Sequence, residues 1–509
     1  MKNKYFHYFV ILLLGCSRMV QAQNATYTEK YRPRFHFTPA INWTNDPNGL
    51  VYYKGTYHLF YQYNPYGIKW GHMSWGHAES HDLIHWKHLP VALTEKDGTM
   101  IFSGSAVIDE KNTTGFGKKE NEIPMVAIYT GHYIADSKNV EDYLQSQQVA
   151  YSLDDGKTWI KYSDNPVLDM HKKDFRDPCV FWYEPGKKWV MAVVLPHEHI
   201  TQFYSSPNLK KWEHLSDFGP AGDVKDIWEC PSLLQVPIAG SSGKKKWVLF
   251  NSQQTTMQYF VGEFDGTHFV NENPSSNIYR PDYGPDYYAG ITYNHLPENH
   301  LPILMGWANN WTYGADIPTY PWRSMMGLPR ELILHKKNNE WILYQQPVSA
   351  VNGLRKKPWS GEQLKVVGEK ELPVRSQQCE ISLSWAPSPN SISGLRLAHG
   401  KQKGLIIGYD EKNKTLFMDR QDAGASSFNE KFAHISKYET KLEKDKDMIR
   451  LDIFFDHSIV EVFANGGESV MTMQIFPDEK DNMIQLFSEG ASNNFLHIKF
   501  WELDTSWVH

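Results

Sequence analysis

A turn that closes on an aromatic residue recurs along the first half of the chain and constrains the fold more than any other feature. Three copies run from a serine through an Asp or Asn to a tryptophan, at residues 80–86, 152–159 and 206–212. A fourth, degenerate copy at 264–269 closes with Phe269 in place of tryptophan. The period is irregular, but its length is that of a propeller blade.

A pair of short apolar runs accompanies each blade and predicts a β-hairpin. Runs 50–53 and 57–63 are joined by Lys54-Gly55, and runs 180–183 and 189–194 by Pro185-Gly186. Three further pairs lie at 105–108 with 125–129, 232–236 with 247–251, and 289–294 with 303–307. Five such units between residues 31 and 346 predict a five-bladed β-propeller. A β-sandwich would also use short strands, but it would not explain the repeated turn.

The repeat stops near residue 347, and a second set of strands follows. Residues 347–365 contain Pro, Gly and Lys and are expected to form a linker. Alternating runs after it predict a β-sandwich over residues 366–509. A chain of 509 residues exceeds the ordinary size of one core. The prediction is therefore an all-β protein, a five-bladed β-propeller followed by a C-terminal β-sandwich.

The N-terminus reads as an export signal, with Lys2 and Lys4 ahead of an apolar run over residues 6–15. This run is too short to span a bilayer. Cleavage after Ala22 would give a signal peptide of residues 1–22, whereas the lipobox-like residues 13–16 would end it at residue 15 and leave a lipid anchor on Cys16. Both interpretations predict an exported protein, periplasmic or at the cell surface or extracellular, with membrane attachment only through Cys16.

Charge and cysteine content exclude several classes of partner. A net charge of -6 and a pI near 6.4 give no electrostatic reason to expect nucleic acid. Only Cys179, Cys230 and Cys379 follow the signal, and an odd number argues against a disulfide framework, although a Cys179–Cys230 bridge stays open. The histidines of residues 72–88 lack the spacing of a closed metal site.

Three carboxylates occupy equivalent places in blades one, three and four, just ahead of the first strand and shortly before a proline. They are Asp46, Asp177 and Glu229. Because the first strands of propeller blades line the central channel, we expect the three to converge at one end of it. Each alone could cap a turn, and Arg176-Asp177 could be a solvated ion pair. Converging acids repel one another, however, and two carboxyl groups flanking a glycosidic bond are the standard means of cleaving it.

Such hydrolysis needs one ionised and one protonated carboxyl group. A hydrogen bond from Asn45 would hold Asp46 ionised, and a place beside Trp228 suits Glu229 to the role of general acid. The same register brings residues 102–105 of blade two and residues 287–289 of blade five to the pocket and predicts aromatic and hydroxyl lining.

Four motifs resemble the signatures of glycoside hydrolase family 32, which comprises invertases, inulinases and levanases. They lie in order at residues 43–49, 102–105, 175–178 and 228–231. The resemblance runs from about residue 31 to the C-terminus, and implies the same two-domain fold and hydrolysis of β-fructofuranosides with retention, without a metal or organic cofactor.

The resemblance also implies roles for individual residues. Asp46 matches the nucleophile, Glu229 the acid/base and Asp177 the transition-state stabiliser. The implied fructose-binding residues are Trp43, Asn45, Gln62, Trp70, Phe102, Ser103, Arg176 and Trp307. For Trp307, a place in the propeller core is an equal alternative.

The expected substrate is a fructan such as levan or inulin, with sucrose as a small substrate. Residues 305–311 and 317–323 look more like those of exo-acting levanases and inulinases than those of plant invertases. An endo-levanase is the first alternative, and an arabinan-cleaving propeller, which usually inverts, is the second. A non-catalytic fructan-binding propeller is the alternative from another class, although such a protein would have no need of Glu229.

Overall fold

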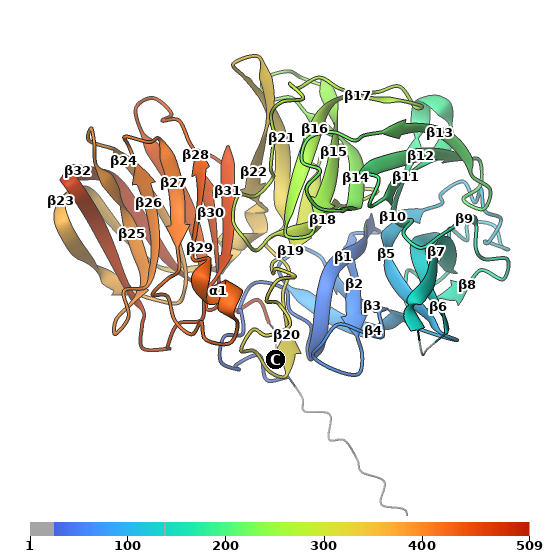
Figure 1. Ribbon diagram of the computed structural model, residues 1–509, viewed down its shortest axis with the longest axis horizontal. Helices are drawn as coiled ribbons and strands as arrows, with labels where there is room; N and C mark the ends of the chain where they lie inside the picture. Colours follow the sequence, from blue (N-terminus) through green and yellow to red (C-terminus); the bar gives the residue numbers. More distant parts are fainter. Residues whose placement is uncertain (1–24, 137–138, 508–509) are drawn as a thin grey trace, which may run out of the picture.

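The computed structural model describes residues 25–136 and 139–507, which form two β domains side by side (Figure 1). The predicted signal peptide and the candidate anchor Cys16 lie outside the described residues. No helix within the described part of the chain is long and apolar enough to cross a membrane.

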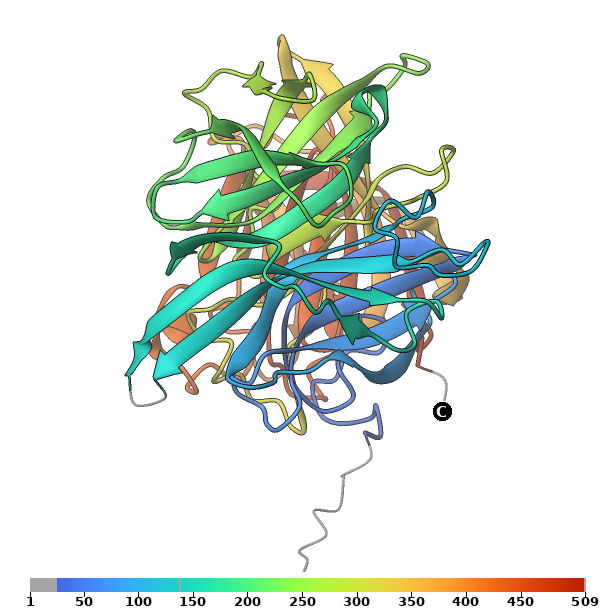
Figure 2. The same ribbon diagram turned by 90° about the vertical axis from the view of Figure 1, so that its right-hand side faces the viewer.

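Five antiparallel sheets form the first domain, which confirms the predicted five-bladed propeller. Blade one contains β1 (Asn42–Tyr53), β2 (Thr56–Asn64), β3 (Ser74–Ser80) and β4 (Trp86–Leu93), and the short β20 (Trp322–Arg323) runs parallel to β1. Blade two contains β5 (Thr99–Ile108), β6 (Met125–Asp136), β7 (Asn139–Ser152) and β8 (Ile160–Lys161), with β9 (Leu168–Lys172) also paired to β7. In Figure 2 the β6–β7 hairpin reaches beyond the rest of its sheet.

Blades three to five follow the same order. Blade three contains β10 (Arg176–Tyr183), β11 (Lys188–Leu195), β12 (Ile200–Ser206) and β13 (Glu213–Phe218), with the 3-10 helix η1 (Glu184–Gly186) in its first turn. Blade four contains β14 (Trp228–Pro237), β15 (Lys245–Gln253), β16 (Thr256–Phe264) and β17 (Phe269–Asn271). Blade five contains β18 (Tyr288–Thr292), β19 (Ile303–Trp307), β21 (Arg330–Lys337) and β22 (Glu340–Pro347).

The recurrent turn joins the third strand to the fourth in blades one to four. Its Asp or Asn side chain accepts backbone N–H groups, as Asp82 Oδ1 does from His85 at 2.8 Å and Asn208 Oδ1 from Lys211 at 3.1 Å. A short polar side chain can thereby replace a backbone acceptor in a tight turn. In blade five the corresponding turn contains Asn338 and Asn339, both with positive φ.

The first strands β1, β5, β10, β14 and β18 contact one another in a ring around the channel. The register of all five is interrupted at equivalent places, between Thr44 and Pro47 in blade one and between Arg176 and Cys179 in blade three, for example. A bulge bends the strand and re-aims a side chain. The expectation that the acids precede their strands was therefore wrong, because Asp46, Asp177 and Glu229 lie at the bulges, inside the strands.

The second domain is a ten-stranded sheet folded into two layers, which confirms the predicted sandwich. Its elements are η2 (Ser349–Leu354), β23 (Arg355–Arg375), β24 (Gln378–Ala386), β25 (Ile392–His399), β26 (Leu405–Asp410), β27 (Thr415–Asp419), α1 (Glu430–His434), β28 (Lys437–Lys441), β29 (Ile449–Asp456), β30 (Ile459–Ala464), β31 (Ser469–Gln474) and β32 (Met483–Leu503). Large apolar side chains of both layers, such as Ile407 of β26 and Phe455 of β29, form its core.

The long strand β32 belongs to both layers. Its first half pairs with β25 and its second half with β24, while β23 pairs with it on the other side. The expectation of a linker over residues 347–365 is therefore wrong beyond Leu354, because β23 begins at Arg355. Only Val366 and Leu372 of β23 are buried, so this edge strand lacks the alternation that would have revealed it, and Pro358 is compatible with an edge.

A buried charged cluster joins the two domains. His36 contacts Asp456 Oδ2 through Nδ1 at 2.8 Å and Glu461 Oε1 through Nε2 at 3.1 Å. The second Glu461 oxygen accepts a hydrogen bond from Arg330 at 2.6 Å. We call His36, Arg330, Asp456 and Glu461 the interdomain cluster. It links the segment before β1, blade five and the sandwich.

Candidate active site

The three predicted acids line one cavity of about 540 Å³ at an end of the propeller channel. Cys230 lies between two of them, with Sγ 3.7 Å from Asp46 Oδ2 and 3.6 Å from Asp177 Oδ2. This cysteine is free, as are Cys179 and Cys379, so the bridge that the sequence left open does not form. The predicted convergence of the acids is confirmed.

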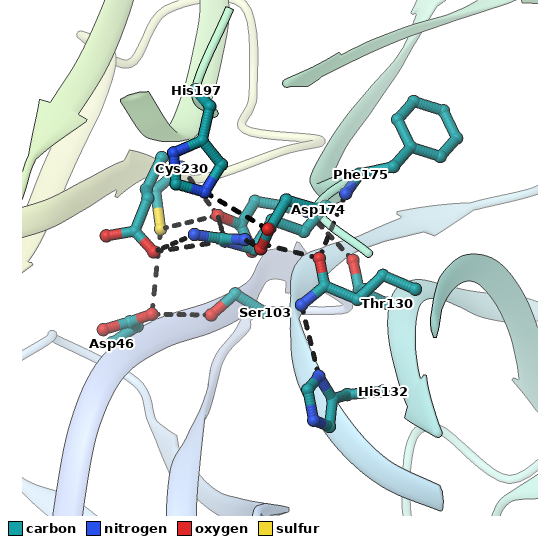
Figure 3. A network of polar contacts seen from close by, with 12 residues as sticks. Asp46, Ser103, Thr130, His132, Asp174, Phe175, His197 and Cys230 are labelled. Carbon is teal, nitrogen blue, oxygen red and sulfur yellow. Dashed lines mark hydrogen bonds and ion pairs between the residues drawn. The ribbon is translucent and has the colours of Figure 1, made fainter. Parts of the chain in front are cut away.

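Asp46 is held at both carboxylate oxygens. Asn45 Nδ2 donates to Oδ1 at 2.9 Å, as predicted, and Ser103 Oγ donates to Oδ2 at 2.6 Å (Figure 3). Trp43 Nε1 donates to Asn45 Oδ1 at 2.7 Å and thereby fixes the orientation of the amide. Burial raises the pKa of Asp46 and the charge of Glu229 adds to this, while the two hydrogen bonds oppose it.

Asp177 sits in a left-handed backbone conformation, with φ +66°, which turns its side chain toward the cavity. Its Oδ2 accepts a hydrogen bond from the Cys230 backbone at 3.0 Å. Burial, with the charges of Glu229 and Asp46, raises the pKa of Asp177 to about 7 although Arg176 acts in the opposite direction.

Glu229 is also held at both oxygens. Oε1 accepts hydrogen bonds from Arg176 Nε at 3.1 Å and Nη2 at 3.0 Å, and the Tyr288 hydroxyl donates to Oε2. The remaining nitrogen of Arg176, Nη1, bonds Asp174 Oδ1 at 2.5 Å. The Arg176 guanidinium therefore donates hydrogen bonds to both Glu229 and Asp174, and its Nε lies 3.9 Å from Asp177 Oδ2.

Most of the predicted substrate-binding residues line the same cavity. They are Asn45, Gln62, Trp70, Phe102, Ser103 and Arg176. Gln62 Nε2 donates to Asn48 Oδ1 at 2.7 Å, which anchors its buried side chain. Trp70 is 46 % exposed and meets the Phe102 ring edge to face, 6.0 Å between centroids. The cavity thus combines polar groups with an apolar wall.

Two predicted residues lie behind the cavity and do not line it. Trp43 and Trp307 are 1 % and 0 % exposed, and the Trp307 indole N–H donates to Ser324 Oγ. Trp307 therefore occupies the propeller core, the alternative considered above. Trp311, which packs 6.0 Å from Trp43 and 4.8 Å from Trp307, lines the cavity in front of them.

The sequence analysis missed one wall of the cavity. His132 of β6, Tyr143 and Gln145 of β7, and Asp174 before β10 all line it. Figure 3 shows His197 at one end of the polar network and His132 at another, with Asp174 between them. Asp174 could have been found as a third charged residue beside Arg176-Asp177, but no motif marks the β6–β7 residues.

Two family models match nearly the whole of the described chain. The glycosyl hydrolases family 32 N-terminal domain matches residues 36–347, and the family 32 C-terminal domain matches residues 350–502. These ranges correspond to the propeller and the sandwich.

Similar proteins match over nearly the whole of this chain. A levanase of Bacillus subtilis is 42 % identical over 96 % of this chain and 72 % of its own length, and an extracellular exo-inulinase of Aspergillus niger is 39 % identical over 97 % and 98 %. The crystal structure of exo-inulinase from Aspergillus awamori matches with a TM-score of 0.88 at 38 % identity, covering 94 % of this chain and all of that one. A β-fructofuranosidase from Schwanniomyces occidentalis, solved with fructosyl-erythritol, matches with a TM-score of 0.83 at 31 % identity over 93 % and 98 %. This chain belongs to glycosyl hydrolase family 32.

Proposed function

We propose that this protein is an exo-acting β-fructosidase that releases fructose from the ends of fructans such as levan or inulin, and also cleaves sucrose. The observation that carries the proposal is the convergence of Asp46, Asp177 and Glu229 on one cavity, with Arg176 among them. The chain is similar to a levanase and to an exo-inulinase, and the names of these relatives indicate fructan substrates.

Asp46 is the nucleophile in this proposal. It attacks C2 of the terminal fructose as the bond to the leaving oxygen breaks, and forms a covalent fructosyl-enzyme. The hydrogen bonds from Asn45 and Ser103 orient the carboxylate for this attack. Because burial raises the pKa of Asp46, the rate should fall as the pH is lowered through that pKa and the carboxylate takes up a proton.

Glu229 is the general acid and then the general base. It gives its proton to the departing oxygen, and later removes a proton from the water that attacks C2, so that the configuration at C2 is retained. Arg176 and Tyr288 hold its two oxygens, which fixes the carboxyl group relative to the leaving oxygen.

Asp177 stabilises the transition state in this proposal. It accepts hydrogen bonds from fructose hydroxyls, which strengthen as positive charge develops on the ring. The bulge at Asp177 supports this role. Its left-handed conformation turns the carboxylate into the cavity, while β10 pairs regularly with β11 from Cys179 onward.

The surroundings of the cavity favour exo action. Trp70 in the loop after β2, the β6–β7 hairpin and Trp311 after β19 line it on different sides. A fructan can enter a cavity enclosed in this way only by its end, whereas an endo-acting enzyme needs a cleft that is open along the polymer.

One comparison of products tests the proposal. The mature protein is incubated with levan, inulin and sucrose in parallel, with Asp46→Ala as the control, and products are resolved by chromatography. Free fructose alone from the earliest times is expected. Early oligosaccharides would mean endo action, and no product from any substrate would favour the non-catalytic binding protein.

The proposed location is outside the cytoplasm. The predicted export signal supports this, as does the description of the Aspergillus niger relative as extracellular. Mass determination of the mature N-terminus distinguishes cleavage after Ala22 from lipid attachment at Cys16.

A further inference from the structure

The cavity extends past the residues that would hold one fructose. The wall that the sequence analysis missed adds His132, Tyr143 and Gln145 from the β6–β7 hairpin, none of which belongs to the motifs above. A volume of about 540 Å³ lies within the range of pockets that hold ligands larger than a single sugar ring. The hairpin therefore lines a part of the cavity that the implied fructose-binding residues do not account for.

A hydrogen-bond relay fixes the protonation of His132. The Phe175 backbone N–H donates to Gln145 Oε1 at 3.1 Å, so the Gln145 amide presents its nitrogen on the other side. That nitrogen, Nε2, lies 3.2 Å from His132 Nδ1 (Figure 3). An amide N–H must donate, so Nδ1 accepts and the ring proton of a neutral His132 is on Nε2.

The ring is also fixed in its plane. Phe102 stacks on one side at 4.4 Å with an interplanar angle of 9°, and the Tyr143 ring lies 4.6 Å away at 31°. Both contacts leave the edge of the imidazole available. No hydrogen bond among the described residues uses His132 Nε2, although the residue lines the cavity.

His132 remains uncharged under ordinary conditions. Burial lowers its pKa to about 4, the charge of Arg176 adds to this, and Asp174 opposes it. Arg176 and Asp174, which both line the cavity, are the charges that act on this pKa. A neutral imidazole with one aligned N–H suits an uncharged acceptor such as a sugar hydroxyl.

We propose that His132 Nε2–H donates a hydrogen bond to a hydroxyl oxygen of the second sugar unit, which makes the β6–β7 hairpin the binding site for the leaving group. This inference rests on the proposed β-fructosidase function. His132 then discriminates between leaving groups that carry a hydroxyl within reach and leaving groups that do not. Gln145 acts on His132 as a positioning residue.

The test compares two substrates in the full-length mature protein. One is a fructosyl-fructose disaccharide, and the other is 4-nitrophenyl β-D-fructofuranoside, whose leaving group has no hydroxyl to accept the bond. His132→Phe keeps an aromatic ring for the stack and removes the donor. The ratio of kcat/KM for the disaccharide to that for the aryl fructoside should fall about tenfold, as expected for the loss of one hydrogen bond.

Two further variants separate the donor from the ring. His132→Gln restores an N–H donor and should recover part of the ratio. Gln145→Glu offers an acceptor to His132 Nδ1, draws the proton away from Nε2, and should lower the ratio while leaving His132 in place. His335→Phe is the matched control and should not change the ratio, because His335 packs against the Tyr344 ring at 4.1 Å in blade five, outside the cavity lining.

The outcomes are distinguishable. An equal loss on both substrates, or no change in the ratio for both His132→Phe and Gln145→Glu, would overturn the inference and leave the β-fructosidase proposal standing. Failure of the wild type to cleave either substrate would instead overturn the proposed function. Thermal unfolding of each variant identifies any that fail to fold. If the variants at one of the two positions, His132 or Gln145, do not fold, the variant at the other position tests the inference.

Discussion

The pKa values of two sets of buried carboxylates in this molecule are shifted in opposite directions. In the interdomain cluster the pKa of Glu461 is lowered to about 2, and that of Asp456 is also lowered. In the cavity the pKa values of Asp46 and Asp177 are raised. Burial is the largest cause in all four and always raises the pKa, so depth does not explain the difference.

The difference lies in the partners. Asp456 and Glu461 share His36, and Glu461 also has Arg330, so each carboxylate directly contacts a cation. In the cavity Arg176 bonds Asp174 and Glu229, whereas Asp46 is bonded by the neutral side chains of Asn45, Ser103 and Cys230. In the interdomain cluster the buried carboxylates are paired with cations and have a structural role. In the cavity the buried carboxylates outnumber the cations, and such an excess of like charge is typical of a functional site.

The largest expected effect is on activity, at the cavity. Asp46→Asn preserves the shape of the side chain and removes the nucleophile, so kcat/KM for sucrose should fall by at least roughly 10⁴-fold. The unfolding temperature should not fall, because a buried unpaired charge is also removed. A substantial residual rate in initial-rate assays would contradict the assignment of the nucleophile.

The largest expected effect on stability is in the interdomain cluster. Arg330→Met leaves Glu461 and Asp282 without the cation they share, and should cost about 3–5 kcal/mol in urea unfolding. Lys54→Met, which breaks an exposed pair with Asp155, is the control and should cost less than about 1 kcal/mol. Similar losses of unfolding free energy in the two variants would show that the buried ion pairs stabilise the protein no more than the exposed pair does.

A smaller effect is expected from pH. The two carboxylates raise the pKa of folded His36 to about 9, against 6.5 when it is unfolded. Its contribution is therefore complete below pH 6.5 and is lost as the pH rises through 9, by up to about 3 kcal/mol. Unfolding measured between pH 6 and about 10 should show this decline, and His36→Asn should remove most of it. An unchanged pH dependence in the variant would sink the explanation.

The smallest expected effect is a gain in stability at the cavity. The pKa of Asp177 is higher in the folded protein, about 7, than its ordinary value of 3.8, so its ionisation costs stability above pH 3.8. Asp177→Asn should therefore raise stability by about 1–2 kcal/mol at pH 8 and by less at pH 4, while activity falls. A lower unfolding temperature at pH 8 would mean that Asp177 is needed for the fold.

Much of the fold could be predicted because its signals are local. The Asp or Asn of the recurrent turn accepts hydrogen bonds from backbone N–H groups two or three residues further on, so the turn between the third and fourth strands of a blade can be recognised from neighbouring residues. The acids could be predicted for a related reason, since a proline soon after each one marks a bulge in a first strand.

The rest depends on contacts between distant segments. Trp307 and Trp311 are four residues apart, and only the packing of blades one and five decides that Trp307 is buried and Trp311 lines the cavity. The relay from Phe175 through Gln145 to His132 joins blade two to the entry of blade three, and its residue types have no characteristic spacing. Strand β23 was missed because its side chains are mostly exposed on both faces.

The path of β32 through both layers of the sandwich has a consequence for how the chain is made. The propeller is complete once residue 347 has been synthesised, and domains generally fold as units, the N-terminal one first. The sandwich cannot follow strand by strand, because β23, β24 and β25 all pair with β32, which comes after the other sandwich strands in the described chain. Until then three strands have an open edge, the condition under which nascent β-sheets associate with the wrong partner.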